Sequence, residues 1–92
     1  MRTASTNEEA AETTGLRAVA WIIGDDDRAG RLLALTGLDA DALRDGLGDR
    51  TVLAAVLAFL ESHEPDLLAC AAALETSPET LVRARAALEG SS

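Results

Sequence analysis

Residues 49–60 read DRTVLAAVLAFL, and this stretch determines the architecture more than any other. Asp49 is a typical N-cap residue, and the nine residues from Val52 to Leu60 are all apolar. A helix that is apolar on every side has no face for solvent, so it is normally buried at the centre of a domain. The run is also far shorter than the ~20 residues that a membrane-spanning helix requires. We therefore expect a central helix around which other helices pack.

Upstream of this stretch, the chain predicts a helix from about Glu8 to Ile23, because Gly24 follows as a helix end. Apolar residues at the spacing i, i+3, i+4 and i+7 predict its inner face. These residues are Leu16, Val19, Ala20 and Ile23.

Between and after these two helices, capping residues and prolines mark further helix starts. The predicted starts are Asp25, Asp39, Glu64-Pro65 and Ser77-Pro78, and the predicted ends are Gly37 and Gly48. The predicted inner residues of the last two helices are Leu67, Cys70, Ala71 and Leu74, then Leu81, Ala84 and Leu88. No segment has a convincing strand pattern. The fold class is therefore all-α, a compact bundle of about five to six short helices.

The chain is long enough for one domain and too short for two. We expect a flexible N-terminal tail at residues 1–7, a single helical domain at residues 8–89 and a flexible C-terminal tail at residues 90–92, because both ends are small and polar. A shift of about 38 residues places the segment 19–22 over 57–60. This similarity indicates either two pseudo-repeated three-helix units or a chance likeness of two stretches rich in Ala and Leu.

Charge excludes some classes of partner. The net charge is −8, the pI is about 4.4, and the eight basic residues are scattered along the chain, all of them Arg. Such a protein repels phosphate backbones and anionic lipids, so we expect no nucleic acid and no membrane as partner. A basic or metal-bridged partner would suit this charge, although solubility alone also explains it.

The residues that could carry chemistry do not form a catalytic or ligand-binding pattern. Asp25, Asp26 and Asp27 are better explained as a cap and first helical turn than as a metal site. His63 is the single histidine, and Cys70 shares its helix face with apolar residues, so a packed core thiol is favoured over a Cys–His dyad. We expect no cofactor, no metal and no enzymatic activity. Without an apolar leader segment at its start, the chain is expected to be cytoplasmic.

Trp21 and Ile22 form a candidate partner surface. Trp21 points away from the predicted inner face of its helix, and together with Ile22 it gives the helix a second apolar side. Either this helix is sandwiched within the core, or Trp21 is an exposed aromatic anchor for a partner.

The segment 31–44, RLLALTGLDADALR, resembles the FLALTGLDP-x-x-LR signature of a small alphaproteobacterial family, domain of unknown function 3572. Two later segments, VLAAVLAFL at 52–60 and HEPDLLA at 63–69, resemble its FLAAVLDFL and DEPLLLAF stretches. The resemblance covers roughly Leu16 to Leu88. It implies a bacterial, cytoplasmic, all-α protein and brings no activity, cofactor or catalytic residue.

Two departures from the family pattern concern stability more than function. Leu32, Val52 and Cys70 stand at positions where the family usually has aromatic residues. Ala40 stands where it has proline.

From these observations we expect a non-enzymatic helical module for protein–protein interaction or regulation, with an unidentified protein as partner. The alternative is an acidic decoy or inhibitor that occupies a basic, nucleic-acid-binding surface on another protein. Self-association is compatible with either function.

Overall fold

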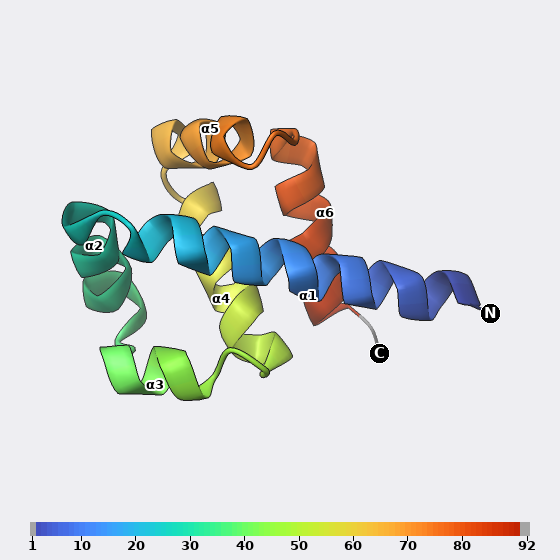
Figure 1. The fold of residues 1–92 in the computed structure, drawn as a ribbon, viewed down its shortest axis with the longest axis horizontal. Helices are drawn as coiled ribbons and strands as arrows, with labels where there is room; N and C mark the ends of the chain where they lie inside the picture. Colours follow the sequence, from blue (N-terminus) through green and yellow to red (C-terminus); the bar gives the residue numbers. More distant parts are fainter. Residues whose placement is uncertain (1, 91–92) are drawn as a thin grey trace.

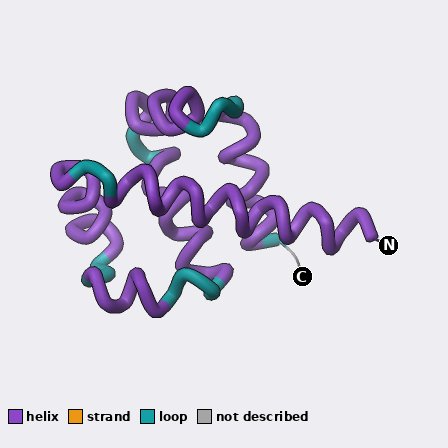
Figure 2. The backbone as a smooth tube through the Cα atoms, in the orientation of Figure 1, coloured by secondary structure: helices purple, strands orange, loops and turns teal. Residues whose placement is uncertain are grey.

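A computed structural model describes the backbone of residues 2–90 and the side chains of residues 9–39 and 41–90. Within this part the chain folds into helices joined by short loops, with no strand (Figure 2). The helices are α1 (Arg2–Ile23), α2 (Asp26–Thr36), α3 (Ala40–Asp45), α4 (Arg50–Glu61), α5 (Glu64–Ala73) and α6 (Pro78–Glu89). The predicted all-α bundle is confirmed.

The first and last helices can be compared with the terminal segments predicted from the sequence. Helix α1 begins at Arg2, earlier than the predicted start near Glu8, and the flexibility of residues 1–7 stays a prediction. Of the predicted C-terminal tail, Gly90 caps α6, and residues 91–92 lie outside the described residues.

Side-chain caps start four of the helices where the sequence predicts them. The side chains of Asp25, Asp39, Asp49 and Ser77 each accept a hydrogen bond from a backbone N–H in the first turn of the helix that follows. Each such cap typically contributes about 1 kcal/mol. Gly37 ends α2 in the left-handed conformation, with φ of 77°, which glycine adopts without strain.

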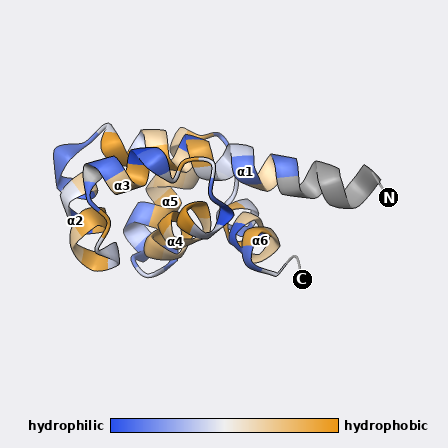
Figure 3. Ribbon diagram, turned by 90° about the horizontal axis from the view of Figure 1, so that it is seen from below, coloured by the Kyte–Doolittle hydropathy of each residue, from blue (hydrophilic) through white to orange (hydrophobic). Residues whose placement is uncertain are grey.

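Helix α4 is the centre of the molecule, as its apolar sequence predicts. Its closest packing partners are α6 and α1, and α1 crosses the bundle as its longest helix (Figure 1). Figure 3 shows a largely apolar ribbon in α4, with α2 on one side and α6 on the other. The buried side chains of α4 are Leu53, Ala54, Val56, Leu57, Phe59 and Leu60.

The predicted inner face of α1 is wrong except at Val19. Leu16 and Ile23 are 42% and 53% exposed, and Ala20 is also exposed. The face that packs inward carries mainly small residues, and it consists of Ala11, Gly15, Ala18, Val19 and Ile22.

The reason for this difference is the short distance between α1 and α4. A Cβ atom added at Gly15 would lie 3.1 Å from the Cβ of Leu53, so a larger side chain there would require Leu53 to move. Leu16 and Ile23 are consequently on the outer sides of α1, whereas Val19 and Ile22 are buried with the small residues.

The last two helices agree better with expectation, since Leu81, Ala84 and Leu88 of α6 and Cys70 and Ala71 of α5 are all buried.

The two halves of the chain are not built alike. Helix α6 has 12 residues and packs against both α1 and α4, whereas α3, its counterpart if the halves were repeats, has six residues and lies at the edge. The long helices α1 and α4 do pack together, as a pair of three-helix units requires.

Substitution of Gly15 tests the close packing of α1 on α4. We expect Gly15→Leu to lower the free energy of unfolding by about 2 kcal/mol, because the added side chain overpacks the interface with Leu53. The matched control is Gly30→Leu in α2, where no atom lies within 4 Å of the added Cβ. That change should raise the free energy of unfolding by up to about 1 kcal/mol through helix propensity. Urea denaturation followed by circular dichroism measures both, and equal stability of the two variants would contradict the packing.

Candidate functional site

An apolar cavity lies where the C-terminal end of α1 meets α2 and α3. Its volume is about 310 Å³, and we call it the α1–α2–α3 groove. The residues that line it are Val19, Ile23, Ala29, Leu32, Leu33, Leu43, Arg44 and Leu47. Seven of the eight are apolar, so the groove offers contact area for apolar groups and little that could orient a polar one.

Local sequence signals put these three helices together. Asp25 caps α2 only two residues after α1 ends, and Gly37 followed by Asp39 turns the chain from α2 into α3. Leu32 and Leu43 are buried and form the floor of the groove, while Ile23 is half exposed at its edge. Two features leave the groove open: Ala29 contributes only a methyl group, and α3 is too short to cover α2.

Acidic residues are concentrated in the segment that forms α2 and α3. Residues 25–49 contain seven Asp and three Arg, which gives −4 of the total charge of −8. Arg44 forms an ion pair with Asp41 inside this segment. Arg28 lies over the ring of Trp21, at the end of α1. Among the described side chains, Asp26, Asp27 and Asp45 form no ion pair. The segment that supplies six of the eight lining residues of the groove therefore carries a net negative charge.

The structure separates the two residues of the predicted partner surface. Ile22 has no exposed surface at all, so its assignment to a partner surface is corrected: it belongs to the core. Trp21 is half-buried and packs against the core. The guanidinium of Arg28 lies over its ring, with 3.7 Å between the guanidinium carbon and the ring centroid, and the same group donates a hydrogen bond to the Trp21 carbonyl. Trp21 is thus partly covered by its own chain.

Sequence reasoning missed the polar contacts that hold α5. Arg31 of α2 donates to Asp66 at 2.8 Å, and Asp66 is only 9% exposed. Arg17 of α1 donates to the carbonyl of Leu74, at the C-terminal end of α5, at 2.9 Å. One signal was available: Asp66 precedes the buried Cys70 by four residues and so lies on the same inward face.

The remaining residues with potential chemistry have packing or capping positions. Cys70 is completely buried, as the core interpretation predicts, and burial raises the pKa of its thiol from 9.0 to about 11. His63 is exposed between α4 and α5 and makes no capping hydrogen bond through its side chain. Asp25 is the cap of α2, with Asp26 and Asp27 in its first turn. Within the described residues, no group of three or more His, Cys, Asp or Glu is placed to hold a metal ion.

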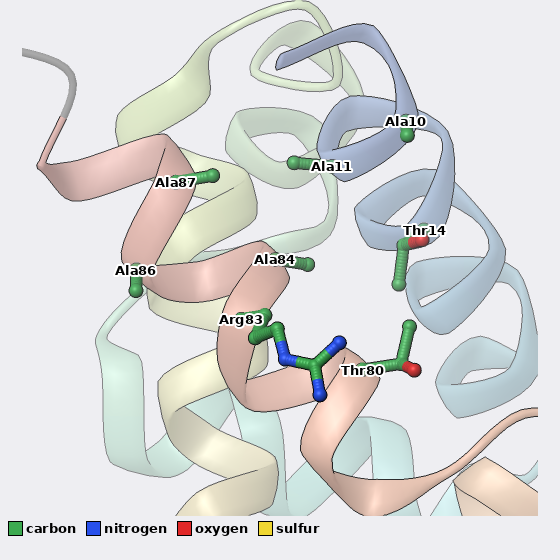
Figure 4. Close-up of a pocket in the computed structure, with 8 residues that line it drawn as sticks. All are labelled: Ala10, Ala11, Thr14, Thr80, Arg83, Ala84, Ala86 and Ala87. Atoms are coloured by element: carbon green, nitrogen blue, oxygen red, sulfur yellow. The ribbon is translucent and has the colours of Figure 1, made fainter. Parts of the chain in front are cut away.

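A second groove runs between α1 and α6 (Figure 4). Its volume is about 400 Å³, and its walls are mostly methyl groups. Ala11 points from α1 towards α6, Ala84 and Ala87 point back, and the Arg83 side chain reaches into the gap near Thr80. Alanine methyl groups bury little area on contact, so this groove has less to offer a partner than the leucine-lined α1–α2–α3 groove.

The fold and its grooves define a small all-α domain with an apolar surface groove. The chain belongs to the family described as protein of unknown function (DUF3572), whose model matches residues 8–91. This membership confirms the family resemblance and assigns no activity. No curated protein and no solved structure matches the chain. In the part of the chain that the structure describes, no helix has both the length and the apolar content needed to cross a bilayer.

The contact between Arg28 and Trp21 can be tested by fluorescence, because Trp21 is the single tryptophan. We expect Arg28→Ala to shift Trp21 emission to longer wavelength and to lower the free energy of unfolding by about 1–2 kcal/mol, since it removes the stacked cation and a hydrogen bond. Arg44→Ala, which removes an exposed ion pair, should change stability by less than about 0.5 kcal/mol and leave the emission unchanged. An unshifted spectrum in Arg28→Ala would show that the guanidinium does not cover the ring.

The burial of Cys70 predicts low thiol reactivity. A pKa of about 11 instead of 9.0 reduces the thiolate fraction near pH 8 roughly 100-fold, and burial blocks access as well. Reaction with a chromogenic disulfide should therefore be at least about 100-fold slower in the native protein than in urea. Comparable rates in the two states would reopen a chemical role for this cysteine.

Proposed function

We propose that this chain is a non-enzymatic interaction module of the bacterial cytoplasm, and that it binds a protein partner through the α1–α2–α3 groove. The observation that carries the proposal is the groove itself, a concave surface lined by leucine, isoleucine and valine side chains. Covering such a surface lowers the free energy of the system by about 25 cal/mol for each Å² of apolar area removed from water.

The exposure of Ile23 supports the same function. This side chain is 53% exposed although it adjoins the buried Leu32 and Val19 in the lining of the groove. A β-branched apolar residue at the edge of an apolar hollow is well placed to contact a bound partner, whereas a scattered surface residue such as Leu35 needs no such explanation.

A specific observation also favours the alternative, an acidic inhibitor that occupies a basic, nucleic-acid-binding surface on another protein. The seven Asp residues in the segment 25–49 concentrate negative charge on one part of the chain. This alternative differs from the first in what binding depends on. It requires charge and would be lost in high salt, but it would tolerate a polar substitution inside the groove.

Affinity capture with matched variants tests the proposed function. We expect the tagged wild-type protein to retain a specific protein from an extract of the cells that encode it, and Ile23→Gln to lose that protein, because the polar amide interrupts the apolar lining. Leu35→Gln is the control, since Leu35 is 69% exposed and does not line the groove. Circular dichroism should show that both variants fold as the wild type does.

Two outcomes contradict this proposal. One is the retention of the same partner by Ile23→Gln, which would place the contact elsewhere. The other is the absence of any protein that distinguishes the folded wild type from Ile23→Gln.

A further inference from the structure

Building on the proposed function, we infer that the partner presents a basic amphipathic helix. Its apolar side chains fill the α1–α2–α3 groove, and its Lys or Arg residues lie over the aspartates of α2 and α3.

The lining of the groove favours apolar side chains over a small molecule. A small-molecule site normally contains several convergent polar groups that orient the ligand. In this groove Arg44 is the one charged lining residue, and it already pairs with Asp41. The volume of about 310 Å³ is at the low end for ligand pockets, and it suits a few apolar side chains presented at helical spacing.

The negative charge of the segment that lines the groove favours a basic partner helix over an acidic one. Residues 25–49 carry a net charge of −4, and the carboxylates of Asp26, Asp27 and Asp45 are exposed with no ion pair among the described side chains. A helix flanked by Lys or Arg gains attraction to these groups, and an acidic helix is repelled. A second copy of this chain would bring its own acidic α2 and α3 to the contact, so self-association through this groove is disfavoured by the same charges.

Two synthetic peptides test the inference. Both are helices of roughly 18 residues, or about five turns, with the same leucines at i, i+3, i+4 and i+7. One carries Lys at the flanking positions and the other carries Glu. Each is titrated into the ¹⁵N-labelled full chain and followed by NMR.

We expect the Lys peptide to shift the amide signals of Ile23, Ala29, Leu33 and Leu47, and to bind at least about tenfold more tightly than the Glu peptide at low salt. Near 0.5 M salt this difference should largely disappear, because exposed charges are then screened. Ile23→Gln should weaken the binding of the Lys peptide, and Leu35→Gln should not. The double change Asp26→Asn with Asp27→Asn should reduce the preference for Lys over Glu while the leucines still bind.

The outcomes separate this inference from the proposed function. Equal binding of both peptides in the groove at low salt would overturn the basic partner and leave the interaction module standing. Binding of neither peptide, or shifts confined to α5 and α6, would also overturn the inference. The proposed function would then be decided by the capture experiment with Ile23→Gln, which makes no assumption about the partner's charge.

Discussion

The close approach of α1 to α4 is the constraint on which the other contacts depend. At Gly15 a Cβ atom would lie only 3.1 Å from the Cβ of Leu53, so any side chain there would force Leu53 to shift. This contact brings the small side chains Ala11 and Ala18 inward and aligns α1 along a helix that has no polar face of its own. Helix α6 covers a further side of α4 and packs on α1 as well. Burial of α4 thus depends on small residues in α1 and large ones in α4 and α6, an alternation of sizes that lets the helices interdigitate.

Outside this three-helix core, polar contacts position the other helices. Arg31 reaches from α2 to Asp66 of α5, and Arg17 reaches from α1 to the carbonyl of Leu74 at the C-terminal end of α5, where the helix dipole favours a cation. Helix α2 itself packs against α1 and α4, and its Leu32 and Leu33 line the groove together with Leu43 of α3. Helix α3 has only six residues, and the α1–α2–α3 groove stays open between it and the other two helices.

A feature of this fold could be predicted from the sequence when it depends on residues close together in the chain, and not when it depends on contacts between distant segments. Helix starts were predictable because capping is local: Asp39 and Asp49 bond to backbone groups two or three residues further along the chain. The central position of α4 was predictable because its composition excludes a solvent face. The inner face of α1 was not, because it depends on the distance to another helix, and large apolar residues were given more weight than Ala and Gly. Neighbouring residues on a helix point about 100° apart. The wrong inner face of α1 therefore gave the wrong burial for both residues at the C-terminal end of this helix. Ile22 is buried and Ile23 is exposed, and with them the candidate surface moves from Trp21 to the groove.

The choice of basic residue links the fold to the surface charge. All eight basic residues are Arg, and six of them make hydrogen bonds, ion pairs or a ring contact to other parts of the described chain. A guanidinium can stack on a ring and donate to a carbonyl at the same time, as Arg28 does at Trp21, whereas an ammonium group lacks the planar surface for such stacking. Arg50 donates hydrogen bonds from its guanidinium to two carbonyls at the end of α6. Because positive charge is used in this way to join helices, many of the aspartates around the groove remain without a cationic partner. The use of arginine in contacts between helices thus affects both the stability of the bundle and the negative charge near the groove. A mutation that removes the partner of one of these arginines would change both properties.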